Sequence, residues 1–125
     1  MKQPLLRKEN ELPYVTEKLG WRYHHIGIPT DNPIPGEEYL AHLKMYVKGF
    51  DTSPYGIEWM RFEDDCPISD IIKKIPHIAF QVDDLEEAIT GKELIGEVSS
   101  PMNGVKMAMI LADGLPVELM EFDRS

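Results

Sequence analysis

The sequence predicts an α+β fold in which two tandem βαβββ-type modules form one curved, mixed sheet shaped like a cup. The evidence is an internal repeat: residues 25–28 (HIGI) match residues 77–80 (HIAF), and residues 57–62 (IEWMRF) match residues 117–122 (VELMEF). Each half therefore opens on a strand that carries a histidine and closes on a strand that carries a glutamate. The first matched pair is 77 − 25 = 52 residues apart and the second is 117 − 57 = 60 residues apart. The first module is thus the shortened one, and we expect that it has lost or shortened one strand.

The first half begins with a polar leader, residues 1–21, in which Gly20 is expected to end a short helix at 14–19. A helix is also predicted at 37–46, because four apolar residues recur there at helical spacing: Tyr39, Leu40, Leu43 and Tyr46. The other elements expected in this half are a strand at 22–28 closed by Pro29, a loop at 32–36, a loop or short strand at 47–56 and a strand at 55–62.

The second half follows the same plan. Its expected elements are a strand at 76–82, a helix at 85–94 that starts with acidic residues, and strands at 96–100, 105–111 and 116–122. The segments between the last three strands, 101–104 and 112–114, contain the Gly, Asn, Asp and Pro residues that are typical of turns. We therefore expect one domain at residues 22–125 after the leader, with modules at about 22–65 and 75–125.

Composition excludes several classes of partner. The 125 residues carry 22 Asp and Glu against 13 Lys and Arg, a formal charge of −9, so nucleic acid and anionic membranes are not expected to bind. The first ten residues become polar too soon for a signal peptide, and no later stretch approaches the ~20 apolar residues of a spanning helix. The single cysteine, Cys66, can form no internal disulfide. We therefore expect a cytoplasmic protein that binds a small-molecule substrate.

Side chains alternate across a strand, so residues two apart share a face. On this rule His25 lies with Tyr23 and Gly27, whereas His24 takes the opposite side, where it packs or caps. The same rule predicts which side chains accompany the two glutamates and wall a substrate pocket: Met60 and Phe62 with Glu58, and Met120 and Phe122 with Glu118.

Two histidines and two glutamates can converge if the modules face each other about a pseudo-two-fold axis. These residues are His25, Glu58, His77 and Glu118. Buried carboxylates among Met and Phe are costly unless they are paired or hold a cation. Imidazole and carboxylate together suit a divalent transition metal such as Zn, Ni, Co, Mn or Fe, with one or two positions left for water or substrate. Such a site can act as a Lewis acid toward a carbonyl oxygen, with a glutamate at its edge as the base.

Paired βαβββ modules with His on the first strand and Glu on the last resemble the glyoxalase I / bleomycin-resistance / dioxygenase superfamily, also called vicinal oxygen chelate proteins. The resemblance covers residues 22–122. It implies that His25, Glu58, His77 and Glu118 are metal ligands and that Glu58 or Glu118 is also the catalytic, proton-shuttling base. It thereby implies a metal-dependent lyase, isomerase or epimerase of the glyoxalase type that acts on a small carbonyl compound. Proteins of this type commonly dimerise, so a homodimer is expected.

Other interpretations stay open at the level of sequence. Members of this superfamily include drug-sequestering proteins without turnover, and iron extradiol dioxygenases that use two His and one Glu. Methylmalonyl-CoA epimerase usually has Gln at the position of Glu58, so a carboxylate there favours the isomerase and lyase branch. Only four arginines are present, which gives no support to a glutathione or acyl-CoA substrate. Glu118 could instead be a solvated strand residue, and the four pocket residues could be ordinary core.

Overall fold

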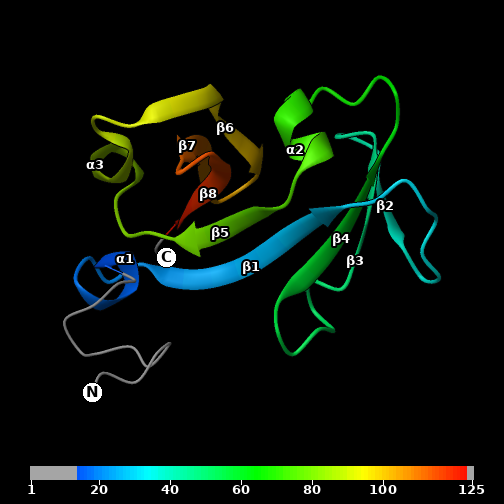
Figure 1. The fold of residues 1–125 in the computed structure, drawn as a ribbon, viewed down its shortest axis with the longest axis horizontal. Helices are drawn as coiled ribbons and strands as arrows, with labels where there is room; N and C mark the ends of the chain where they lie inside the picture. Colours follow the sequence, from blue (N-terminus) through cyan, green and yellow to red (C-terminus); the bar gives the residue numbers. More distant parts are fainter. Residues whose placement is uncertain (1–13, 124–125) are drawn as a thin grey trace, which may run out of the picture.

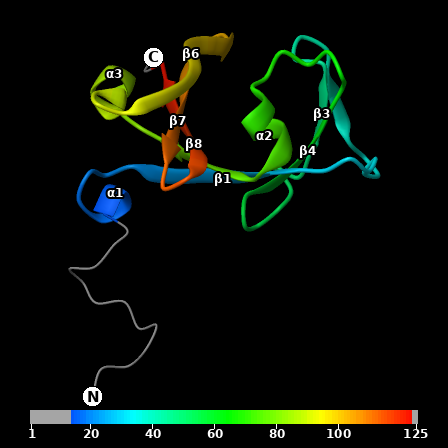
Figure 2. The same cartoon turned by 45° about the horizontal axis from the view of Figure 1, so that its top comes forward.

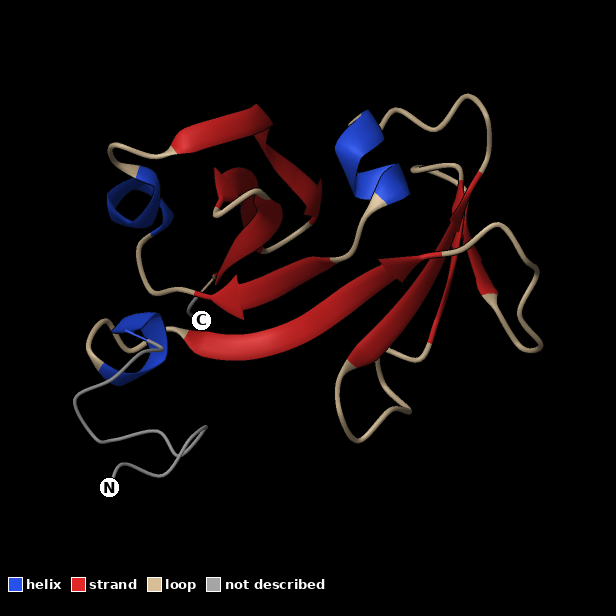
Figure 3. Ribbon diagram, in the orientation of Figure 1, coloured by secondary structure: helices blue, strands red, loops and turns tan. Residues whose placement is uncertain are grey.

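Eight strands form one strongly curved sheet in the computed structural model, which describes residues 14–123. The strands are β1 (Arg22–Pro29), β2 (Glu38–Leu40), β3 (Met45–Lys48), β4 (Ile57–Phe62), β5 (His77–Gln81), β6 (Glu93–Met102), β7 (Val105–Ala112) and β8 (Leu115–Phe122). The helices are α1 (Tyr14–Glu17), α2 (Asp70–Lys74) and α3 (Leu85–Ile89). The strand order across the sheet is β2-β3-β4-β1-β5-β8-β7-β6. In Figures 1 and 3, β1 and β5 form the floor and the outer strands rise from it as two walls, which confirms the predicted cup.

The two halves of the sheet are built alike. β1 pairs in parallel with β4, and β5 pairs in parallel with β8, while β1 and β5 run antiparallel at the centre. Gly27 lies opposite Glu58 in the first module, and Ala79 lies opposite Glu118 in the second. These pairs are separated by the same 52 and 60 residues as the sequence repeat. The repeat is therefore structural, and it places both glutamates at equivalent positions of the two modules.

The prediction of a helix at residues 37–46 is wrong, because this segment forms the hairpin β2-β3. Tyr39 pairs with Tyr46 across it, and their rings lie 4.7 Å apart. The chain turns at residues 41–44, where Lys44 adopts a positive φ of 54°. Residues 39 and 46 therefore lie side by side because they pair across the hairpin. The apolar spacing that predicted a helix is equally compatible with this pairing. The first module keeps four strands, but β2 and β3 are much shorter than their counterparts β6 and β7, which confirms the expected shortening. Within the described residues it also has no helix between β1 and β2, where the second module has α3.

A helix that the sequence pattern did not predict, α2, lies between the two walls of the cup (Figure 2). Its buried residue, Ile72, joins a cluster with Met45 and Met60 from the first module, Met109 from the second, and Cys66. The helix has only five residues, with Asp70 in its first turn and two lysines in its last, an arrangement that suits the helix dipole. α2 thus fills part of the cup with an apolar core shared by both modules.

The second module is covered on its outer face by α3. Leu85 of this helix packs in a cluster with Val82, Ala108, Ile110 and Leu119, whose side chains point away from the cup. The helix ends at Ile89, shorter than the predicted 85–94, because Gly91 takes a positive φ of 75° and β6 begins two residues later. The strands predicted at 105–111 and 116–122 are confirmed as β7 and β8.

Of the predicted leader, residues 1–13 lie outside the described residues. The rest contains α1, within the range expected for it, and Trp21, whose ring packs on Phe80 at 5.8 Å. Among residues 14–123, no helix is both long and apolar enough to cross a membrane.

Candidate metal centre

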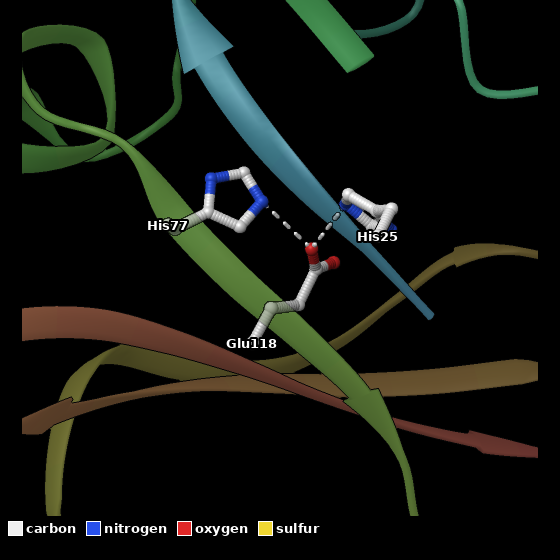
Figure 4. Close-up of side chains that lie close together, drawn as sticks. All are labelled: His25, His77 and Glu118. Carbon is white, nitrogen blue, oxygen red and sulfur yellow. Dashed lines mark hydrogen bonds and ion pairs between the residues drawn. The ribbon is translucent and has the colours of Figure 1, made fainter. Parts of the chain in front are cut away.

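Three buried side chains meet on the inner face of the sheet: His25 from β1, His77 from β5 and Glu118 from β8 (Figure 4). One carboxylate oxygen, Glu118 Oε1, lies 3.3 Å from His25 Nε2 and 3.1 Å from His77 Nε2. The three potential ligand atoms lie within 4.8 Å of one another. A single chain therefore supplies two imidazole nitrogens and a carboxylate oxygen to one point.

Strand register explains this convergence. His25 lies opposite Ala79, and Ala79 in turn lies opposite Glu118, so the two functional side chains stand in one row across three strands. His77 lies in the next row, opposite Gly27. Because paired residues share a face of the sheet, the alternation rule applied to His25, His77 and Glu118 is confirmed.

Gly27 makes room for the imidazole of His77, a role that sequence reasoning missed. A Cβ placed on Gly27 would lie 2.2 Å from His77 Cε1 and 2.8 Å from each ring nitrogen. The ring therefore lies directly against the backbone of β1, where only glycine fits. The sequence repeat could have pointed to this role, because the two modules differ at this position: the first has Gly27 and the second has Ala79.

Glu58 lies next to the three-residue group without joining it. Its carboxylate Oε1 is 3.6 Å from His25 Nε2, and its side chain is 18% exposed, against 11% for Glu118. The three ligand atoms that lie within 4.8 Å of one another belong to His25, His77 and Glu118. The structure thus brings all four predicted ligands to one region, and it separates Glu58 from the other three by position and exposure.

The two carboxylates have opposite pKa shifts. For Glu118, burial would raise the pKa, but hydrogen bonds and positive charge from His25 and His77 outweigh it and hold the pKa at about 2. For Glu58, burial raises the pKa, and the charge of Glu118 adds to this, while His25 and His77 oppose it. Burial also lowers the pKa of His25, yet Glu118 and Glu58 together raise it on balance. Glu118 is therefore ionised near neutral pH, whereas its surroundings shift the pKa of Glu58 in the opposite direction, upward.

The donor set fits a divalent transition metal. Two imidazole Nε2 atoms and a carboxylate oxygen, all buried and all directed at one point, form the three-ligand pattern of open catalytic sites. The close packing of His77 on Gly27 holds one of the candidate ligands in place. Borderline nitrogen and oxygen ligands of this kind suit Zn, Ni, Co, Mn or Fe.

Strict alternation predicted that His24 takes the opposite side of β1 from His25, and this prediction is wrong. The β1-β5 register shifts between Tyr23 and His25, so β1 carries one extra residue there, and such a bulge re-aims side chains. As a result, His24 Nδ1 lies 2.7 Å from His25 Nδ1. Tyr23, which was predicted to share the His25 face, is 47% exposed and donates a hydrogen bond to the Tyr55 carbonyl.

The four predicted pocket residues fall into two groups. Met60 is 3% exposed and, with Phe62, belongs to the apolar cluster beside α2. Phe122 instead stacks on the ring of His24 at 5.6 Å, and Met120 is half-buried opposite Met107 of β7. Contact of these side chains with a substrate stays a prediction.

A cleft of about 410 Å³ lies elsewhere, between α3 and the segment that precedes β1. Leu19, Trp21 and Glu87 are among the residues that line it. None of the predicted site residues lines it, so this cleft and the candidate metal centre are separate features of the described part of the chain.

Comparison with solved structures identifies the fold. A hypothetical protein from Bacillus halodurans aligns over 84% of this chain and 96% of its own, with 21% identity and a TM-score of 0.59. Methylmalonyl-CoA epimerase from Mycobacterium tuberculosis aligns over 82% of this chain and 89% of its own, with 18% identity and a TM-score of 0.54. No protein-family model and no curated protein matches the sequence. The chain has the glyoxalase, or vicinal oxygen chelate, fold.

Proposed function

We propose that this protein is a metal-dependent isomerase, lyase or epimerase that acts on a small carbonyl compound. One observation carries the proposal: His25, His77 and Glu118 direct two imidazole nitrogens and one carboxylate oxygen at a single point inside the cup. The fold supports it, because one of the similar structures is named as an epimerase. Fold alone does not imply function, so the argument depends on the site.

In this proposal His25, His77 and Glu118 hold the metal. Glu118 suits the role because it remains ionised at any pH near neutrality. Both histidines turn Nε2 toward the Glu118 carboxylate, so both can offer the same ring atom. When bound, a divalent transition metal supplies a Lewis acid that polarises a carbonyl group and stabilises the negative charge that develops on it.

Glu58 serves as the proton carrier. Its carboxylate is 3.6 Å from His25 Nε2 and is more exposed than that of Glu118, so it can reach a carbon atom of a substrate placed over the site. Burial raises the pKa of Glu58 and so makes it a better base than an ordinary solvated carboxylate. It takes the proton from the carbon next to the carbonyl group and returns it to a neighbouring atom or to the other face.

The surroundings favour a small substrate without a large anionic group. Three of the described cations are paired away from the site: Arg22 with Asp83, Arg61 with Glu37 and Lys44 with Asp65. Aromatic rings lie beside the site instead, since Phe50 is 5.8 Å from the His25 ring and 45% exposed. An uncharged carbonyl compound with an apolar group matches these neighbours better than an acyl-CoA.

Elemental analysis combined with hydrogen exchange tests the proposal. We expect about one transition metal per chain in the untagged protein and none in His25→Ala. The loaded protein should catalyse exchange of the α hydrogen of small ketones and aldehydes with D₂O, followed by NMR. Glu58→Gln should keep the metal and lose exchange by roughly 10²- to 10⁴-fold. Equal and negligible metal in wild type and His25→Ala would refute the proposal, and unchanged exchange in Glu58→Gln would refute the role of Glu58.

We also propose that the protein is a cytoplasmic homodimer. The lone cysteine, Cys66, is buried and unpaired, which suits a reducing compartment. In the first module no helix corresponds to α3 within the described residues, and Trp59 on this outer face is 40% exposed. A second copy could cover that face.

A further inference from the structure

His24 and its neighbour His25 are in direct contact through their ring nitrogens. The two Nδ1 atoms are 2.7 Å apart, a normal hydrogen-bond distance. The contact exists because β1 carries an extra residue at this point, which turns His24 toward its neighbour. Nothing in the assignment of His25, His77 and Glu118 as ligands uses this contact.

The ring of His24 is held in place by two aromatic side chains. Phe50 stacks on it with centroids 4.9 Å apart, and Phe122 stacks on it at 5.6 Å, each at an interplanar angle of 28°. Stacked rings at these distances attract each other and restrict rotation. His24 therefore presents Nδ1 to His25 from a fixed position.

The geometry determines the tautomers that metal binding requires. If His25 gives the Nε2 lone pair to a metal, its remaining ring hydrogen must be on Nδ1. The partner that faces this hydrogen is His24 Nδ1, which must then accept it and carry its own hydrogen on Nε2. A hydrogen bond of this kind orients a ligating imidazole and raises its basicity toward the metal.

We propose that His24 is a positioning residue that holds the His25 imidazole with Nε2 free to bind the metal. The inference rests on the proposed function, since it concerns the same metal centre. It gives a purpose to the bulge in β1, which otherwise breaks a regular strand pairing.

The second ligand, His77, is oriented in a different way. Its Nδ1 is buried without a hydrogen-bond partner among the described residues. The residue of the second module that corresponds to His24 is 24 + 52 = 76, which is Pro76 and has no side chain able to accept a hydrogen bond. His77 is instead held by its packing on Gly27. The support from His24 is therefore specific to the first module, and its loss should weaken His25 alone.

Two substitutions of His24 separate hydrogen bonding from packing. His24→Phe keeps an aromatic ring that can stack on Phe50 and Phe122 but has no acceptor for the His25 hydrogen. His24→Asn loses the ring, but its amide oxygen can occupy roughly the place of Nδ1 and accept that hydrogen. The dissociation constants for Zn²⁺ and Co²⁺ would be measured by competition with a chromophoric chelator, and the visible absorption of bound Co²⁺ would report ligand geometry.

We expect His24→Phe to bind both metals about 10- to 100-fold more weakly and to alter the Co²⁺ spectrum. His24→Asn should stay within a few-fold of wild type and keep the spectrum. Circular dichroism and the melting temperature of the metal-free proteins check folding, and His24→Leu replaces the Phe variant if that one does not fold.

The outcomes distinguish this inference from the proposed function. Wild-type affinity and spectrum in His24→Phe, with metal bound as expected in wild type, would overturn the role of His24 and leave the metal centre standing. Weak binding in His24→Asn but not in His24→Phe would also overturn it, because packing would then be what matters. Absence of metal binding by the wild-type protein would overturn both.

Discussion

Replacing Gly27 by alanine adds a single methyl group at the point where β1 meets the ring of His77. A methyl carbon there would lie 2.2 Å from His77 Cε1, whereas ordinary contacts begin at 3.4 Å, so the ring must move by 3.4 − 2.2 = 1.2 Å. The ring is 4% exposed and its Nε2 is 3.1 Å from Glu118, so a shift of this size breaks the convergence of the ligands.

Gly27→Ala should destabilise the protein, although replacing glycine by alanine within a strand usually stabilises it. Gly27 is not among the residues with positive φ, so backbone preference alone would make alanine more stable in a strand by roughly 0.5–1 kcal/mol. Overpacking of a buried site costs about 1–3 kcal/mol. We therefore expect Gly27→Ala to lower the free energy of unfolding, and to weaken metal binding by about 10- to 100-fold.

Urea unfolding of the metal-free protein and chelator competition would measure the two effects. Ala79→Gly is the matched control, because Ala79 is the equivalent residue of the second module and faces His25. It should cost some stability but keep metal affinity within a few-fold. In the background of His77→Ala the penalty of Gly27→Ala should largely disappear, because the ring is gone. A Gly27→Ala protein with wild-type stability and affinity would show that His77 does not lie where the structure has it.

Three further predictions follow from the site and the outer face. Chelator treatment should lower the melting temperature, because a metal at 100 times its Kd stabilises the native state by about 2.7 kcal/mol; an unchanged value would contradict a native-state metal site. In the metal-free protein the pKa of Glu118 is held at about 2, so the stability it contributes exists above the unfolded carboxyl pKa of ~4.3 and is lost as pH falls toward 2. In Glu118→Gln the free energy of unfolding, measured with urea, should therefore fall less steeply as the pH is lowered. An equally steep fall in this variant would contradict the lowered pKa of Glu118. Trp59→Glu should convert a wild-type dimer to monomer in light scattering, whereas a monomeric wild type would rule the dimer out.

The repeat in the sequence predicted most of the fold correctly, because short matched segments show which residues form equivalent strands in the two modules. Histidine and glutamate at matched offsets identified β1, β4, β5 and β8, the four strands that build the centre of the sheet. The hairpin β2-β3 was missed because the apolar residues of 37–46 satisfy helical spacing and hairpin pairing equally. α2 was missed because five residues give too short a pattern to distinguish from a linker.

His25, His77, Glu58 and Glu118 could be chosen from the sequence alone, because strand alternation and the repeat select them without any knowledge of distances. That three of the four meet within 4.8 Å, from one chain, was decided by register between strands far apart in the sequence. The position of His24 was likewise decided by the bulge, which adds one residue to β1 but leaves no mark in a local pattern. Long-range pairing sets such details because hydrogen bonds between strands, not preferences within a strand, determine which residues face each other.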